Sequence, residues 1–155
     1  MPNESAFDHP IHKMWIMLDQ AYVAASRCQE AVFARAGLTL QQYRVLMVID
    51  AAQKPVKLTD VARWLNRNNN SISLIVDRME KVNLVERVRD LKDRRALRLV
   101  MTAKGEEFFK RATVRGRELI EAMMSCCTEG EMQVLTYLLG RLSEEAARAS
   151  RANGS

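Results

Sequence analysis

The chain has 155 residues, of which 48% are apolar and 28% charged, with 24 Lys and Arg against 19 Asp and Glu. This length suits one ordinary domain, or one domain with helical arms, and leaves little room for two independent cores; the apolar content excludes global disorder. We expect no membrane span, no secretory signal and no disulfide framework among the three cysteines, and therefore a cytoplasmic protein.

Residues 1–10 are polar and are predicted to form a flexible arm. A helix is predicted over residues 11–36, because apolar side chains recur at every third or fourth position, at Trp15, Leu18, Tyr22 and Ala25. Gly37 is a suitable residue to end this helix. Thr39 is a suitable N-cap for the next helix, which we expect to end before Pro55.

Two further helices are predicted in the middle of the chain. The first is brief and has Thr59 as its expected N-cap. The second spans about residues 69–82, and its apolar face consists of Ile72, Ile75, Val76, Met79 and Val82. A turn over residues 66–68 joins them, which matches a helix-turn-helix.

The apolar period changes from 3.6 to 2 after Asn83, a residue that tolerates the positive φ found at helix ends. Residues 85–89 and 97–101 then alternate as two strands joined by a polar, cationic turn, which predicts a β hairpin or wing. Thr102 is expected to cap a long helix that ends at a break near Thr128. A last helix follows, and residues 150–155 are expected to form a flexible tail.

The excess positive charge lies in one segment. Residues 57–98 hold eleven Lys and Arg and six Asp and Glu, so they carry the net charge of +5 of the whole chain. A localised basic surface is the usual footprint of a polyanion-binding protein. A solvated Arg-rich face would account for the charge alone equally well.

The ordered combination of these motifs resembles the MarR family of bacterial winged helix-turn-helix regulators. The resemblance covers residues 38–105, and its most specific part is the Asp93-Arg94-Arg95 wing followed by the helix start at Thr102 to Gly105. It implies a mainly α fold: a DNA-binding lobe over residues 38–105 with a two-stranded β wing, flanked by dimerisation helices over residues 11–36 and 107–149. Two departures are Asn83, where the family commonly has Gly, and Leu74, where it more often has a polar residue.

The second helix of the helix-turn-helix is expected to enter the DNA major groove, where its N-terminal residues meet base edges. Asn and Ser supply donors and acceptors there, and Leu74 can pack on a thymine methyl group. An Asn/Ser cluster also suits an ordinary turn and cap. The expected DNA-binding residues are Thr59, Arg63, Asn68, Asn69, Asn70, Ser71, Ser73, Leu74, Arg78, Lys92 and Arg94.

The wing is expected to add contacts to the DNA backbone. Arg94 at its tip is placed to enter an adjacent minor groove, and phosphates would be met by Arg87, Arg89 and Lys92. The resemblance further implies that Arg95 turns back to pair with Asp77, bracing the wing against the helix, and that Asp93 orders the turn.

The resemblance also implies a homodimer, whose terminal helices interlock across a two-fold axis; an intramolecular helical core is the alternative. Family members commonly hold a small aromatic or phenolic acid between these helices and the DNA lobes, or sense oxidants through cysteine. Such a pocket would be lined by His12, Met14, Trp15, Tyr22, Arg44 and Met47, although a stripe of this kind is more often core. Cys28 is expected to pack as a small hydrophobe. Cys126 and Cys127, at a helix break, are the redox candidates, without a nearby cation to lower a pKa.

No enzyme motif occurs: the sequence has no phosphate-binding Gly loop and no zinc-protease or nucleophile-elbow pattern, and no cofactor or metal is expected. The scarcity of aromatic residues argues against a platform that stacks RNA bases. We therefore predict a homodimeric double-stranded DNA-binding repressor that a small molecule modulates. The alternatives are an oxidant-sensing regulator of the same fold and a winged-helix module that docks an acidic protein.

Overall fold

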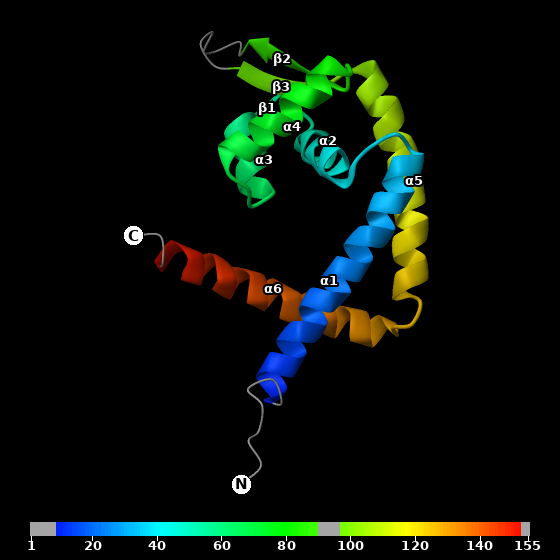
Figure 1. Ribbon diagram of the computed structural model, residues 1–155, viewed down its shortest axis with the longest axis vertical. Coiled ribbons are helices and arrows are strands. Elements are labelled where there is room, and N and C mark those ends of the chain that lie inside the picture. Colours follow the sequence, from blue (N-terminus) through cyan, green and yellow to red (C-terminus); the bar gives the residue numbers. More distant parts are fainter. Residues whose placement is uncertain (1–8, 90–96, 153–155) are drawn as a thin grey trace. The chain divides into compact units, whose positions relative to one another are not determined.

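A computed structural model describes residues 9–89 and 97–152 of the chain (Figure 1). The elements in chain order are α1 (Pro10–Arg35), α2 (Leu40–Ala52), β1 (Val56–Lys57), α3 (Leu58–Trp64), α4 (Asn69–Lys81), β2 (Val85–Arg89), β3 (Leu97–Met101), α5 (Ala103–Met124) and α6 (Glu129–Ala152). The expected mainly α fold with a winged helix-turn-helix is confirmed. The chain divides into two compact units, one ending at Leu119 and the other beginning at Ile120.

The helix ends follow local backbone chemistry. Pro10 occupies the start of α1, after the His9 N-cap. Gly37 has a φ of +83°, as a residue that ends a helix often does. The Thr39 hydroxyl accepts from the Gln42 N–H at 3.2 Å, and the Gln42 side chain accepts from the Thr39 N–H at 2.9 Å. This reciprocal capping box fixes the start of α2.

The helix-turn-helix consists of α3 and α4, with one correction at its start. The N-cap of α3 is Lys57, without a side-chain bond, so Thr59 lies inside the first turn rather than at the cap. The strand β1 leads directly into α3, so no loop residue precedes the helix to supply a capping side chain. At the start of α4, the Asn68 Oδ1 atom accepts from the Ser71 N–H at 2.7 Å.

The buried face of α4 is nearly as predicted. Ile72, Val76 and Met79 are fully buried, whereas Val82 is 46% exposed. Val82 follows the last helical residue, and the chain turns there through Asn83, whose φ is +59°. Its side chain therefore no longer follows the apolar face of the helix.

The wing belongs to a sheet of three strands rather than two. The strands are antiparallel in the order β1-β3-β2. Val56 pairs with Leu99 across β1 and β3, and Val85 pairs with Met101 across β2 and β3. With only two residues, β1 is too short to show an alternating pattern in the sequence. The turn of the wing, residues 90–96, lies outside the described residues.

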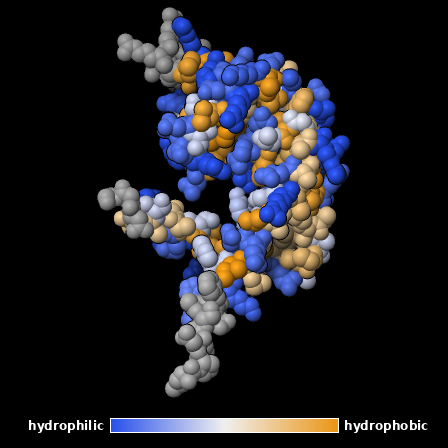
Figure 2. All heavy atoms as spheres, viewed as in Figure 1, coloured by the Kyte–Doolittle hydropathy of each residue, from blue (hydrophilic) through white to orange (hydrophobic). Residues whose placement is uncertain are grey.

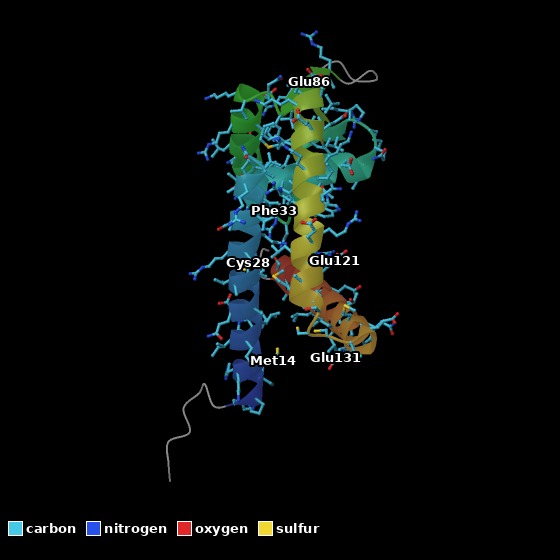
Figure 3. All side chains as sticks on the ribbon, turned by 90° about the vertical axis from the view of Figure 1, so that its right-hand side faces the viewer. Met14, Cys28, Phe33, Glu86, Glu121 and Glu131 are labelled. Atoms are coloured by element: carbon cyan, nitrogen blue, oxygen red, sulfur yellow. The ribbon has the colours of Figure 1, made fainter. Side chains whose placement is uncertain are left out.

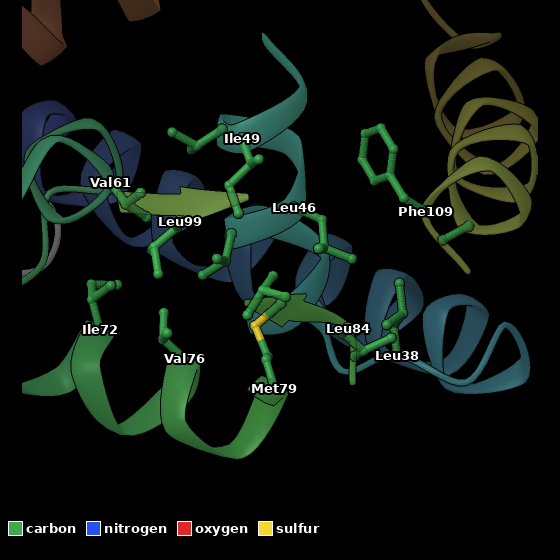
Figure 4. Close-up of a cluster of buried hydrophobic side chains, with 14 of the residues drawn as sticks. Leu38, Leu46, Ile49, Val61, Ile72, Val76, Met79, Leu84, Leu99 and Phe109 are labelled. Atoms are coloured by element: carbon green, nitrogen blue, oxygen red, sulfur yellow. The ribbon is translucent and has the colours of Figure 1, made fainter. Parts of the chain in front are cut away.

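The core of the first unit joins the helix-turn-helix to α2, β3 and the nearby parts of α1 and α5. Buried side chains of α4 face Leu46, Ile49 and Leu99 (Figure 4). Phe33 of α1 stacks on Tyr43 of α2 with ring centroids 4.1 Å apart. This close packing of buried side chains holds α4 at a fixed position within the first unit.

Helices α1 and α5 approach closely where Phe33 meets Gly116 (Figure 3 labels Phe33). A Cβ atom at Gly116 would lie 2.9 Å from the Phe33 ring. The lack of a side chain at Gly116 therefore makes room for the aromatic ring.

The end of α4 is tied to the start of α5. The Thr102 hydroxyl donates to the Asn83 carbonyl at 2.6 Å, and the Lys104 ammonium donates to the Val82 carbonyl at 2.8 Å. Gly105 allows the backbones to meet, because a Cβ atom there would lie 2.0 Å from the Leu84 carbonyl oxygen. These contacts anchor the C-terminus of α4 to the long helix that leaves the lobe.

The second unit contains the end of α5 and all of α6. Thr128 and Glu131 form a capping box at the start of α6, and the hydrogen bonds from Thr128 lower the pKa of Glu131. Helix α6 continues to Ala152, three residues into the expected flexible tail, because this end is rich in helix-forming Ala and Arg. Among the described residues, no helix is both long and apolar enough to cross a membrane.

Candidate nucleic-acid interface

The outward face of α4 presents side chains suited to base and phosphate contacts. Asn70, Leu74 and Arg78 are exposed at intervals of four residues and so share one edge of the helix. Leu74 is 60% exposed, although it is apolar. Figure 2 shows hydrophilic side chains over most of the visible face of this lobe. This edge therefore carries side chains of the kind that contact bases in the major groove, with the polar Asn70 and Arg78 on either side of the apolar Leu74.

The other residues of the helix-turn-helix that are expected to contact DNA differ in their exposure and in whether their side chains are already hydrogen-bonded. Thr59 and Asn69 are exposed and Ser73 is half-buried. Arg63 is exposed and approaches Asp60 at 3.5 Å. In contrast, Asn68 and Ser71 are engaged in the cap of α4, so the Asn68 Oδ1 atom is not free to accept from a base. Asn68 therefore acts as the N-cap of α4, a position that Asn residues favour.

Arg87 joins the wing to α4. Its Nη2 atom donates to Asp77 Oδ1 at 2.7 Å, and its Nη1 atom bonds to Glu80 Oε2. The Arg87 N–H donates to the other Glu80 oxygen at 3.1 Å. Only 22% of the Arg87 side chain is exposed, so this guanidinium bridges two carboxylates instead of extending toward a phosphate.

Part of the expected wing lies outside the described residues, namely Lys92, Asp93, Arg94 and Arg95. The expected pairing of Arg95 with Asp77 is thus not described, while Asp77 is held by Arg87. The role of Glu80 was not anticipated from the sequence. A signal for it exists, because Asp77 and Glu80 are three residues apart on a helix and so lie on one face.

The residues expected to line an effector pocket are only partly brought together. The side chains of Arg44 and then Ser26 hydrogen-bond the Tyr22 hydroxyl, and together with the charges of Arg44 and Arg67 they lower the pKa of that phenol. Tyr22 of α1 and Arg44 of α2 are thus brought into contact. Met47 packs partly against the core.

The other expected pocket residues lie farther along α1. Trp15 precedes Tyr22 by seven positions, which places it about 10 Å away along the helix. His12, Met14 and Trp15 are all exposed (Figure 3 labels Met14). Within one chain, these three side chains therefore do not complete the site at Tyr22 and Arg44.

A separate pocket of about 680 Å³ lies within the first unit. It is formed by the end of α2, the residues before β1, the end of β3 and α5, and its lining includes Ile49, Asp50, Pro55, Met101, Phe109 and Lys110. None of the residues expected for the effector lines it.

One of the three cysteines, Cys28, also differs from expectation. Cys28 is exposed rather than packed, because much of the apolar stripe of α1 is left uncovered by the rest of the chain. Cys126 is exposed and Cys127 half-buried. A hydrogen bond with Cys126, followed by partial burial, raises the pKa of Cys127.

Comparison with known proteins identifies relatives over most of the chain. The model of the MarR family matches residues 38–97. The homoprotocatechuate degradative operon repressor of Escherichia coli is 31% identical over 124 residues, covering 80% of this chain and 83% of the repressor. The transcriptional repressor MdtR of Bacillus subtilis is 26% identical over 98 residues, covering 63% of each chain.

Solved structures share the fold. MarR of Escherichia coli, solved as a cysteine-to-serine variant complexed with operator DNA, superposes with a TM-score of 0.77 at 20% identity, covering 89% of this chain and 98% of MarR. The organohalide-sensing regulator RdhR in its 2,4-dichlorophenol-bound form gives a TM-score of 0.81 at 21% identity, covering 94% of this chain and 87% of RdhR.

Proposed function

Because the chain belongs to the MarR family of transcriptional regulators, we propose that this DNA-binding regulator is a homodimeric repressor of a pseudo-palindromic operator. It is a regulator rather than an enzyme. We further propose that it acts in the cytoplasm and that a small aromatic acid or phenol relieves its binding. The observation that carries the proposal is the exposed edge of α4, held in place by the Arg87 bridge and the Thr102 anchor.

Operator reading is assigned to α4 and the residues around it. Asn70 can make a bidentate contact to adenine, and Leu74 can pack on a thymine methyl group. Arg63 and Arg78 are assigned to phosphates, and Thr59, Asn69 and Ser73 to flanking contacts. Lys92 and Arg94 of the wing are assigned to the neighbouring backbone and minor groove. The bridge at Arg87 supports this assignment, since readout needs rigidly placed side chains.

Homodimerisation is supported by apolar side chains that the chain itself leaves uncovered. On α1, Trp15 and Met17 are 57% and 60% exposed. On α6, no described residue is buried, and the exposed side chains include Val134, Leu135, Tyr137, Leu138 and Leu139. Apolar surface of this extent on a soluble regulator marks an interface. A second copy of the chain would cover it and would place two copies of α4 for two half-sites.

The chemical class of the effector is inferred from the contact between the Tyr22 phenol and the Arg44 guanidinium. A guanidinium next to a phenol suits a carboxylate or phenolate, because it donates charged hydrogen bonds to an anion. The RdhR structure holds 2,4-dichlorophenol, and the Escherichia coli relative is named for homoprotocatechuate degradation. The bound phenol and the operon name belong to those proteins; for this chain they support the class of small aromatic anions. Completion of the pocket by His12 and Trp15 would require the second subunit.

The test combines an operator selection with a measurement of mass in solution. Genomic fragments bound by the protein are sequenced, and sedimentation equilibrium is run with and without a selected duplex. The proposal expects an inverted repeat with half-sites about 34–36 Å apart, bound by two chains. Enrichment without any inverted repeat, or a monomer at micromolar concentration, would overturn the homodimeric repressor. Capture of an acidic protein instead of DNA would favour the interaction module.

A further inference from the structure

Two adjacent thiols lie in the short link between α5 and α6. The Sγ atoms of Cys126 and Cys127 are 3.7 Å apart. The Cys126 thiol donates to the Met123 carbonyl oxygen at 3.4 Å, which keeps this sulfur near the last turn of α5. Cys126 is exposed, so a solute can reach the pair. The link therefore presents two sulfurs side by side at the surface.

Local hydrogen bonds hold the backbone on both sides of the pair. Toward α5, the Cys127 N–H donates to the Met124 carbonyl at 3.0 Å, and the Ser125 hydroxyl donates to the Ala122 carbonyl at 2.8 Å. Toward α6, Thr128 and Glu131 form the capping box (Figure 3 labels Glu131). A pair of ligands held in this way loses little conformational entropy when it binds a common partner.

The geometry of adjacent residues disfavours a direct disulfide between Cys126 and Cys127. Cα atoms of consecutive residues are about 3.8 Å apart across an ordinary peptide bond, whereas disulfides usually join Cα atoms about 4.4–6.8 Å apart. An atom placed between the two sulfurs removes this conflict, since each sulfur then bonds to that atom rather than to the other sulfur. The partner should be soft, because thiolates prefer soft acceptors.

We propose that Cys126 and Cys127 form a chelating site for trivalent arsenicals that carry one organic substituent. In the reaction with hydrated phenylarsine oxide, two S–H bonds and two As–OH bonds break, two As–S bonds form, and two water molecules leave. Arsenic keeps its oxidation state of three, so the step needs no oxidant and no reductant. The site lies entirely within residues 123–131 and is independent of the proposed operator binding.

The test treats the full-length protein with phenylarsine oxide, challenges it with 2-mercaptoethanol, and counts adducts by intact-mass spectrometry. We expect one adduct per chain that survives this monothiol and is removed by the dithiol 2,3-dimercaptopropanol. Replacing either thiol leaves a single As–S bond, so C126S and C127S should bind about a hundredfold more weakly, or worse. C28S is the matched control and should keep the resistant adduct, because the exposed Cys28 has no neighbouring thiol in the sequence.

Circular dichroism of each variant separates loss of the site from loss of the fold. A monothiol-resistant adduct that persists in a folded C126S or C127S protein would overturn the proposal. So would a parent protein that yields no resistant adduct, or one whose adduct disappears in C28S.

Discussion

Arg87 of β2 donates from Nη2 to Asp77 Oδ1 of α4 at 2.7 Å, and the same guanidinium also bonds to Glu80. The strand β2 and the helix α4 are thereby fixed to each other by charge-assisted hydrogen bonds, which are stronger than neutral ones. An arginine that the basic segment offers for phosphate contact is instead used to position its neighbours.

Replacing Arg87 by Met should separate bracing from phosphate contact. The variant should lose about 1–2 kcal/mol of unfolding free energy in urea titrations, because Asp77 and Glu80 lose their partner at a partly exposed site. Its DNA affinity should fall while the slope of log K against log[salt] stays at the parental value. A slope reduced by about 0.9 would instead identify Arg87 as a phosphate contact.

Arg78 is the matched control for that measurement, since it is an exposed arginine of α4, the helix to which Arg87 is bonded. Arg78→Met should leave stability nearly unchanged, weaken binding to all duplexes alike, and reduce the salt slope by roughly one phosphate contact.

Asn70→Ala should relax base preference at one operator position. Loss of a bidentate contact to adenine costs about 1–3 kcal/mol of discrimination, so the variant should bind the parent operator and its single-base substitution nearly equally. Competition binding with duplexes that differ at each position measures this. Unchanged discrimination at every position would remove Asn70 from the reading edge.

Gly105→Ala should destabilise the lobe. The added Cβ atom would lie 2.0 Å from the Leu84 carbonyl oxygen, which is backbone and cannot move away cheaply. Gly130→Ala is the control, because nothing lies within 4 Å of its Cβ position, and its stability should change by no more than about 1 kcal/mol. Thermal unfolding of both variants tests the pair: equal midpoints would contradict the close contact between α5 and the α4–β2 turn.

Alkaline titration should report the contact between Tyr22 and Arg44. The guanidinium favours the phenolate and so lowers the pKa of Tyr22, and tyrosinate absorbance should appear at a lower pH in the parent than in Arg44→Met. Since the folded-state pKa lies below that of the unfolded chain, the phenolate form adds stability as pH rises through the folded value. Superimposable titration curves would contradict the contact on which the effector site rests.

Features set by local backbone chemistry were predictable from the sequence. The Thr39 cap, the positive φ of Gly37 and Asn83, and the buried Ile72 and Val76 all follow from short-range patterns. The resemblance added the order of the elements, and the fold agrees with it.

Features that join distant segments were not predictable. Val56 and Lys57 form the strand β1 because Val56 pairs with Leu99, which lies far along the chain. The Arg87 bridge depends on the angle between β2 and α4, which no periodicity encodes. Cys28 was expected to be packed, but an apolar stripe tells which side is buried only where another element covers it.

The most direct test of the central claim is a fluorescence-anisotropy titration of a selected operator duplex and a scrambled duplex over a salt series. We predict tighter binding of the operator at every salt concentration, with log K falling steeply as log[salt] rises, by about 0.9 per phosphate contacted. Equal affinity for both duplexes, or an affinity that does not change with salt, would contradict sequence-specific DNA binding by this chain.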